Sequence, residues 1–169
     1  SFLRYRVLAE KQARKEAQEK KGSNEVTLEE IYRKLDRYVV FDIQHAMEIE
    51  VQTELSLLQA NPYMMQVYQM AVELEKPIIA VSDMYLPTKV IEEALKKNGY
   101  TQISRIFLSQ ECGFSKRSGR LFPYVREQMG AKKKYLHFGD NYTADLLRAK
   151  AAGFDTRYYT NVNRLGNPH

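Results

Sequence analysis

The sequence predicts an α/β protein with a Rossmann-like parallel sheet, preceded by a region that is helical throughout. From Lys76 onward, short apolar runs alternate with amphipathic stretches, which is the pattern of parallel strands joined by crossover helices. Before Lys76, apolar residues recur at the spacing of one helix face. We therefore expect two domains, a helical cap-like region over residues 1–75 and an α/β core over residues 76–169.

The first half should contain successive helices separated by clear start and stop signals. Gly22 follows a stretch of strong helix formers and is a typical stop. Thr27 and Glu30 have the spacing of a capping box, so a helix should begin at Leu28. The helices expected here cover residues 2–20, residues from 28 onward, an unbroken helical pattern over 38–58, and residues 62–74.

The second half should contain four parallel strands. The first, Ile78 to Val81, is a continuous apolar run of the kind expected where a strand is covered on both faces. Right-handed crossovers place the carboxyl ends of such strands at one edge of the sheet, where ligands bind. The expected strands are 78–81, 105–108, 135–138 and 156–159, and the expected helices are 87–98, 119–129 and 143–152.

Composition indicates a globular protein of ordinary hydrophobic content, 44% over 169 residues. The longest apolar runs are far shorter than the roughly 20 residues that a spanning helix needs, so we expect no membrane span. Cys112 is the single cysteine and cannot form an internal disulfide. We therefore expect a cytoplasmic protein, and nothing in the sequence indicates its oligomeric state.

The net charge of +5 is concentrated at the beginning of the chain. Residues 1–21 hold seven basic side chains against three acidic ones, all on one alanine- and glutamate-rich stretch. Nucleic-acid binding would favour basic groups interleaved with exposed aromatic residues. We therefore interpret this charge as a solvated helix face rather than a polyanion site, and we expect no nucleic acid as a partner.

Three expected strand ends carry groups that could do chemistry. Ser82-Asp83 follows the first strand, Ser115-Lys116-Arg117 lies after the second, and Gly139-Asp140-Asn141 with Asp145 follows the third. Each has a plain structural explanation when taken alone. A serine at a strand end can cap the next helix, a single lysine is usually a surface residue, and Gly-Asp-Asn is a common turn.

Taken together, these residues favour a site for a metal ion and a phosphoryl group. Asp140 and Asp145 are spaced so that both carboxylates can converge on one hard cation, for which Mg²⁺ is the natural choice. The Ser82 hydroxyl and the Lys116 ammonium group would then bind the phosphoryl oxygens opposite the metal. The remaining candidates, as substrate contacts, are Asp83, Arg117 and Asn141.

At these residues the sequence resembles the haloacid-dehalogenase-like (HAD) superfamily of hydrolases. Residues 78–82 are similar to its second motif, Lys116 to its third, and residues 139–145 to its fourth. The segments around Ser82, Lys116 and Asp140 resemble, more narrowly, HAD-like domains associated with bacterial glycosyltransferases. The resemblance implies a magnesium-dependent phosphohydrolase with a helical cap, and a glycosyltransferase domain or partner.

The first HAD motif, Asp-x-Asp, is absent from the 169 residues. Asp42 follows an apolar run, but Gln44 stands where the second carboxylate should be, and we favour a helical interpretation of this segment over a nucleophile. In the related domains, segments like 4–14 and 27–32 follow the nucleophile. We therefore expect that strand just upstream of Ser1, a chain that is catalytically silent as given, and exposed strand edges that need cover.

Three functional interpretations remain open at this stage. The first is a phosphohydrolase acting on a small phosphorylated metabolite or a sugar phosphate. The second is a non-catalytic HAD-like module that binds a phosphorylated ligand or docks a glycosyltransferase partner. The third is a generic Rossmann-like domain whose strand ends only cap helices, although no Gly-x-Gly-x-x-Gly motif supports a dinucleotide cofactor.

Overall fold

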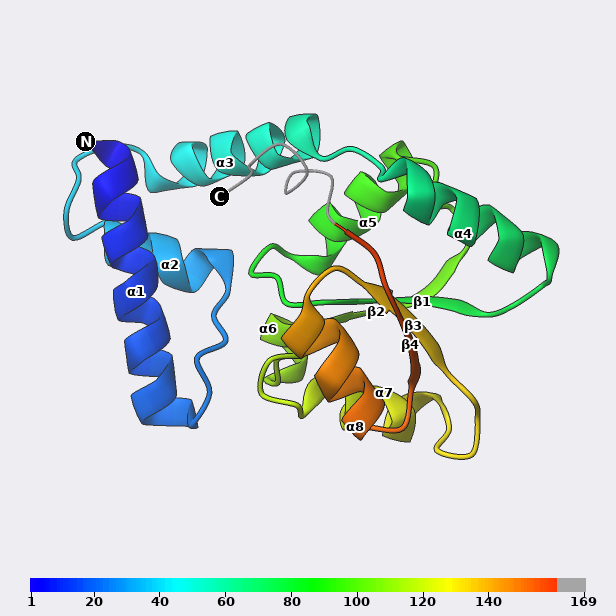
Figure 1. Cartoon of the computed structure of the whole chain (residues 1–169). Coiled ribbons are helices and arrows are strands. Elements are labelled where there is room, and N and C mark those ends of the chain that lie inside the picture. The colour runs from blue at the N-terminus through cyan, green and yellow to red at the C-terminus, as the bar shows by residue number, and fades with distance from the viewer. Residues whose placement is uncertain (161–169) are drawn as a thin grey trace. The chain divides into compact units, whose positions relative to one another are not determined.

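The structure is a computed structural model that describes residues 1–160, and it forms two compact units (Figure 1). The first unit is Ser1–Gly113 and the second begins at Phe114. The mixture of helices and parallel strands, with a helical N-terminal region, confirms the predicted fold class. The first unit contains α1 (Phe2–Lys21), α2 (Leu28–Leu35), α3 (Ile43–Leu57), α4 (Pro62–Glu73), β1 (Ile78–Ser82), α5 (Thr88–Lys97), β2 (Ile103–Leu108) and α6 (Ser109–Cys112).

The second unit contains α7 (Leu121–Met129), β3 (Leu136–Gly139), the π-helix η1 (Tyr142–Arg148), α8 (Ala149–Ala151) and β4 (Asp155–Tyr158). The helix expected over 143–152 therefore begins as a π-helix, a form often found at functional sites. The helices before β1 belong to the same compact unit as β1 and β2. The proposed domain boundary at residue 75 stays a prediction.

The first two helices pack closely because α1 presents small side chains. Ala9, Ala13 and Ala17 recur every four residues on α1 and are buried in the hydrophobic core with α2. The predicted capping box is confirmed, since Thr27 accepts a hydrogen bond from the Glu30 amide and Glu30 accepts one from the Thr27 amide. The interpretation of α1 as a solvated basic face is wrong for Arg6, which is only 7% exposed.

The helical pattern expected over residues 38–58 is interrupted, because α3 begins only at Ile43. Asp42 is its N-cap residue and accepts a hydrogen bond from the His45 amide. Val39 and Val40 are β-branched and favour helices weakly, whereas aspartate is a strong N-cap, so the chain turns before Asp42. Asp42 therefore caps a helix and does not end a strand, which removes it as a nucleophile candidate.

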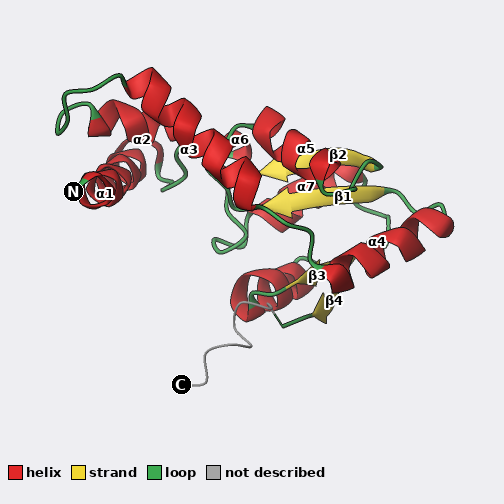
Figure 2. Cartoon of the chain, turned by 90° about the horizontal axis from the view of Figure 1, so that it is seen from above, coloured by secondary structure: helices red, strands yellow, loops and turns green. Residues whose placement is uncertain are grey.

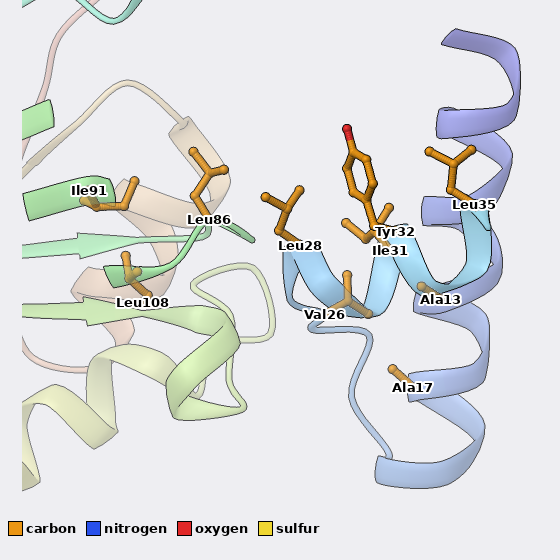
Figure 3. Close-up of a cluster of buried hydrophobic side chains, with 11 residues drawn as sticks. Ala13, Ala17, Val26, Leu28, Ile31, Tyr32, Leu35, Leu86, Ile91 and Leu108 are labelled. Carbon is orange, nitrogen blue, oxygen red and sulfur yellow. The ribbon is translucent and has the colours of Figure 1, made fainter. Parts of the chain in front are cut away.

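The core of the first unit joins its helices to its strands (Figure 3). Leu28 and Ile31 of α2 lie between the alanines of α1 and a second group formed by Leu86, Ile91 and Leu108. Leu86 is fully buried and belongs to the loop that follows β1. The helical region is thus built into the same core as the strand end that carries Ser82.

In each unit the strands form one parallel pair (Figure 2). In the first pair, β1 and β2 run in parallel with Ser82 opposite Leu108, and in the second β3 and β4 place Gly139 opposite Tyr158. All five residues of β1 are half-buried, so both of its faces are partly covered. Among the described residues β1 pairs only with β2.

Within residues 1–160, we find no helix of the length and apolar character needed to span a membrane.

Candidate phosphoryl and metal site

Lys116 is presented by a tight turn that its serine neighbours close. The amide of Ser118 donates to the Ser115 hydroxyl at 3.0 Å, and the Ser118 hydroxyl donates to the Ser115 carbonyl at 2.8 Å. Ser115 itself is buried, and the Gly119 amide donates to the Lys116 carbonyl at 2.9 Å. The turn therefore fixes the backbone of Lys116 just before α7, while Arg117 beside it is exposed.

The second part of the site is the segment from β3 into the π-helix. Gly139 is the last residue of β3, Asp140 and Asn141 form the connection, and Asp145 lies in the first turn of η1. Asn141 caps this helix, because its side-chain oxygen accepts a hydrogen bond from the Ala144 amide at 2.9 Å. The predicted strand-end turn is thus observed, and it carries Asp145 back toward the end of β3.

Gly139 is required by space rather than by backbone conformation. A Cβ atom built at this position would overlap Cβ and Cγ of Asp145, so any side chain here would displace the carboxylate. Glycine at this strand end therefore allows the backbone to approach the carboxylate closely.

Asp145 is the centre of a buried hydrogen-bonded cluster. Its side chain is 3% exposed, and Oδ1 accepts a hydrogen bond from the Lys116 Nζ at 2.6 Å. The His137 Nε2 lies 3.1 Å from the same oxygen, and the Asn141 amide donates to Oδ2 at 3.0 Å. We call these four residues the Asp145 cluster, and it brings the candidate residues Lys116, Asn141 and Asp145 together.

The cluster keeps Asp145 ionised. Burial alone would raise the pKa of this carboxyl group, but the hydrogen bond from His137, the charge of Lys116 and the hydrogen bonds from Lys116 and the Asn141 amide outweigh burial. The pKa of Asp145 is therefore well below its ordinary value. A carboxylate held in this way is a permanent negative charge at neutral pH.

Asp140 lies directly between Gly139 and Asn141 and is half-buried. Ser82 ends β1 and is half-buried, and the exposed Asp83 follows it. Both belong to the first unit, whereas the Asp145 cluster belongs to the second. The meeting of Ser82 and Asp83 with the cluster stays a prediction.

His137 is the site residue that the sequence argument did not single out. It belongs to β3, where its ring contacts Phe122 edge-on with centroids 4.8 Å apart. A histidine two residues before a glycine at a strand end points to the same side of the strand as that glycine, because side chains alternate. That alternation was the available signal.

Comparison with models of protein families finds no match, and comparison with curated proteins finds none either. Solved structures do match. YfnB from Bacillus subtilis, described as a HAD-hydrolase and solved bound to magnesium, is 19% identical with a TM-score of 0.60, and the match covers 93% of this chain and 71% of that one.

Two further structures match over a similar range. A dehalogenase solved with an intermediate complex is 18% identical, with a TM-score of 0.57 and coverage of 83% of this chain and 60% of that one. A hydrolase from Streptococcus pneumoniae TIGR4 is 18% identical, with a TM-score of 0.53 and coverage of 80% and 70%. At these identities the likeness shows the fold alone, which this chain shares with YfnB and the two other structures.

Proposed function

We propose that the chain provides the metal- and phosphoryl-binding part of a magnesium-dependent, HAD-like phosphohydrolase that acts on a small phosphorylated metabolite or sugar phosphate. The observation that carries the proposal is the Asp145 cluster, in which a buried carboxylate is in direct contact with a lysine. Asp140, a second carboxylate, lies in the connection that follows β3. The fold shared with HAD-type hydrolases supports it, as does the magnesium ion bound to YfnB.

The donor set suits Mg²⁺, which commonly takes one or two protein carboxylates and completes its shell with water and substrate phosphate. Asp140 and Asp145 could supply these carboxylates, although within residues 1–160 no three side chains of histidine, cysteine, aspartate or glutamate gather as a ready-made metal cage. Asp145 already accepts three hydrogen bonds, so Asp140 would be the direct ligand. Bound Mg²⁺ would neutralise charge on the phosphoryl oxygens.

The chain's own residues would orient the ligand. Lys116 carries the positive charge that would face the phosphoryl oxygens, and Ser82 would donate its hydroxyl to one of them. Arg117, Asp83 and Asn141 are the proposed contacts to the rest of the substrate. Because Asp-x-Asp is absent from the 169 residues, we expect binding without phosphate release from this chain.

The missing motif also favours a second candidate, a non-catalytic module that binds a phosphorylated ligand or docks a glycosyltransferase domain. The two candidates share the binding site and differ only in turnover. A form that supplies an Asp-x-Asp strand and still releases no phosphate from a broad panel of phosphate esters would favour the module.

The binding step is tested by titrating Mg²⁺ into the full chain with isothermal calorimetry. Asp140→Asn should lower the magnesium affinity at least tenfold, because an amide is a weaker ligand for a hard cation than a carboxylate. Its stability should change little, because asparagine fits a turn as well as aspartate does.

Asp155→Asn is the matched control. Asp155 is exposed and begins β4, where it pairs with Leu136 at the opposite end of the strands from Gly139, so the same charge is removed away from the site. Equal magnesium affinities for the two variants, or no binding by the unmodified chain, would reject the metal site.

A further inference from the structure

A second charged cluster, partly buried, lies in the first unit, outside the residues assigned to the site. Arg6 of α1 holds Glu50 of α3 with two parallel hydrogen bonds, Nε to Oε2 at 2.8 Å and Nη2 to Oε1 at 2.7 Å. Its third nitrogen donates to Glu10 at 3.0 Å. Arginine and carboxylate match in this two-pronged geometry, which fixes the orientation of both side chains.

Two tyrosines complete the cluster around Glu50. The Tyr32 hydroxyl of α2 donates to Oε2 at 2.6 Å, and the Tyr85 hydroxyl donates to Oε1 at 3.2 Å. The Arg6 guanidinium group also lies over both rings, 5.6 Å from the Tyr32 centroid and 5.3 Å from the Tyr85 centroid. We call Arg6, Tyr32, Glu50 and Tyr85 the Glu50 cluster.

Tyr85 differs from the other members because it belongs to no helix. It lies in the loop after β1, three residues beyond Ser82 and two beyond Asp83. The Tyr85 carbonyl accepts a hydrogen bond from the Leu28 amide at 3.0 Å. Leu28 is the first residue of α2, so its amide has no partner within that helix and the loop supplies one. The helical region thus holds this loop by side chain and backbone together.

The protonation states keep this arrangement in place around neutral pH. Burial, followed by the negative charge of Glu50, raises the pKa of Tyr85 to about 12, so its hydroxyl remains a donor. Burial opposes ionisation of Glu50, yet the hydrogen bonds from Arg6 and Tyr32 and the Arg6 charge hold the pKa of Glu50 below its ordinary value.

We propose that Arg6, Glu50 and Tyr85 are positioning residues that set the conformation of the loop after β1, and through it the presentation of Ser82 and Asp83 to a phosphorylated ligand. The helical region then acts on the strand end directly, besides any role as a cap. The loop-holding step stands on the contacts within the first unit. The ligand step rests on the proposed function.

The plain alternative is an ion pair that only holds α1, α2 and α3 together. Tyr85→Phe and Tyr32→Phe separate the two explanations, because each removes one hydroxyl donated to Glu50 and keeps the ring over Arg6. Tyr32 provides the shorter of the two bonds and belongs to a helix, whereas Tyr85 belongs to the loop. A purely structural cluster should therefore suffer at least as much from Tyr32→Phe.

The readout is amide hydrogen exchange of the full chain, resolved residue by residue by NMR. In Tyr85→Phe the Leu28 amide should exchange about tenfold faster, the factor that one modest hydrogen bond to a charged group is worth. The Ile31 amide of the same helix, bonded to the Thr27 carbonyl, should keep its rate. Tyr32→Phe should leave the Leu28 amide unchanged relative to Ile31.

An unchanged Leu28 rate in Tyr85→Phe would overturn the proposal, and so would a parallel change of Leu28 and Ile31 in both variants. The ligand step is read from calorimetry with inorganic phosphate in the presence of Mg²⁺, where Tyr85→Phe should weaken phosphate binding severalfold and Tyr32→Phe should not. Equal weakening by both variants would refute the ligand step. If the unmodified chain binds no phosphate, the proposed function fails while the exchange result still decides the loop-holding step.

Discussion

Each unit holds a carboxylate among hydrogen-bond donors, a half-buried one at Glu50 and a buried one at Asp145, and the two are held in different ways. Glu50 is held by the two-pronged guanidinium group of Arg6 and by two tyrosine hydroxyls. Asp145 is held by the single ammonium group of Lys116, by His137 and by a backbone amide. A second carboxylate, Asp140, lies in the connection before the helix that carries Asp145, whereas the second carboxylate beside the Glu50 cluster, Glu10, is itself bonded to Arg6.

The two clusters differ in how freely the cation can contact another anion. The two-pronged contact between arginine and a carboxylate fixes the geometry of both side chains. The partners of Glu50 lie 18 to 44 residues away in sequence, and the Glu50 cluster therefore joins distant segments. A lysine is a compact charge on a flexible stem and can turn toward another anion. The Glu50 cluster therefore suits fixed architecture, and the Asp145 cluster suits exchange with a phosphoryl group.

The largest expected effect is on stability, from breaking the Glu50 cluster. Arg6→Ala leaves a largely covered carboxylate, 16% exposed, without its cation, which should lower the free energy of unfolding by about 3 kcal/mol, measured by urea denaturation. The double variant Arg6→Met with Glu50→Leu removes both charges and should recover most of that loss. If Arg6→Ala were as stable as the unmodified chain, the ion pair between Arg6 and Glu50 would not contribute to stability.

Gly139→Ala tests the Asp145 cluster by a steric clash that changes no charge. The added Cβ would overlap the Asp145 side chain, so we expect a loss of about 2 kcal/mol and of magnesium affinity together. Gly22→Ala is the control, since Gly22 has a left-handed φ of +65° but open space around it. It should cost about 1 kcal/mol and leave magnesium binding intact, and similar binding in both variants would contradict the assigned geometry.

Acid titration tests how much the ionised Glu50 contributes to stability. Because the folded-state pKa of Glu50 is lowered, its contribution to stability is complete above the unfolded value of about 4.3 and is lost as the pH falls through the lower folded value. The unfolding free energy of the unmodified chain should therefore fall more steeply below that pH than the free energy of Glu50→Gln. If the free energies of unfolding of the two proteins fell in parallel with pH, Glu50 would not contribute to the acid dependence of stability.

The smallest expected effect belongs to the helix start that positions Tyr32. Thr27→Ala removes the side-chain half of the capping box of α2 and should cost about 1 kcal/mol in unfolding free energy. Thr27→Ser keeps the acceptor oxygen and should cost less. Neither variant should alter magnesium binding, and a change in it would mean that the two units respond to one another.

Local chemistry explains which features the sequence could predict. The capping box at Thr27 and Glu30, the helix start at Pro62 and the strand ends at Ser82 and Gly139 depend on neighbouring residues, and all are present in the structure. The burial of Arg6 depends on Glu50, which is 44 residues away, so a local pattern of charges suggested a solvated face instead.

The pairing of the strands also depends on residues that are distant in sequence. Alternating apolar runs predicted four parallel strands, but which strands pair depends on partners that no local signal identifies, and the result is two pairs. In the candidate site, Lys116, Asn141 and Asp145 could be chosen because they follow strands. His137 could be chosen only by knowing which face of β3 lies toward Asp145.

The most direct test of the central claim is calorimetric titration of inorganic phosphate into the full chain, with and without Mg²⁺. If Asp140, Asp145 and Lys116 form one site, the metal and the phosphate must strengthen each other's binding by the same factor. We predict phosphate binding at least tenfold tighter with Mg²⁺, and loss of that gain in Asp140→Asn. Phosphate affinity that is independent of Mg²⁺, or unaffected by Asp140→Asn, would contradict the account.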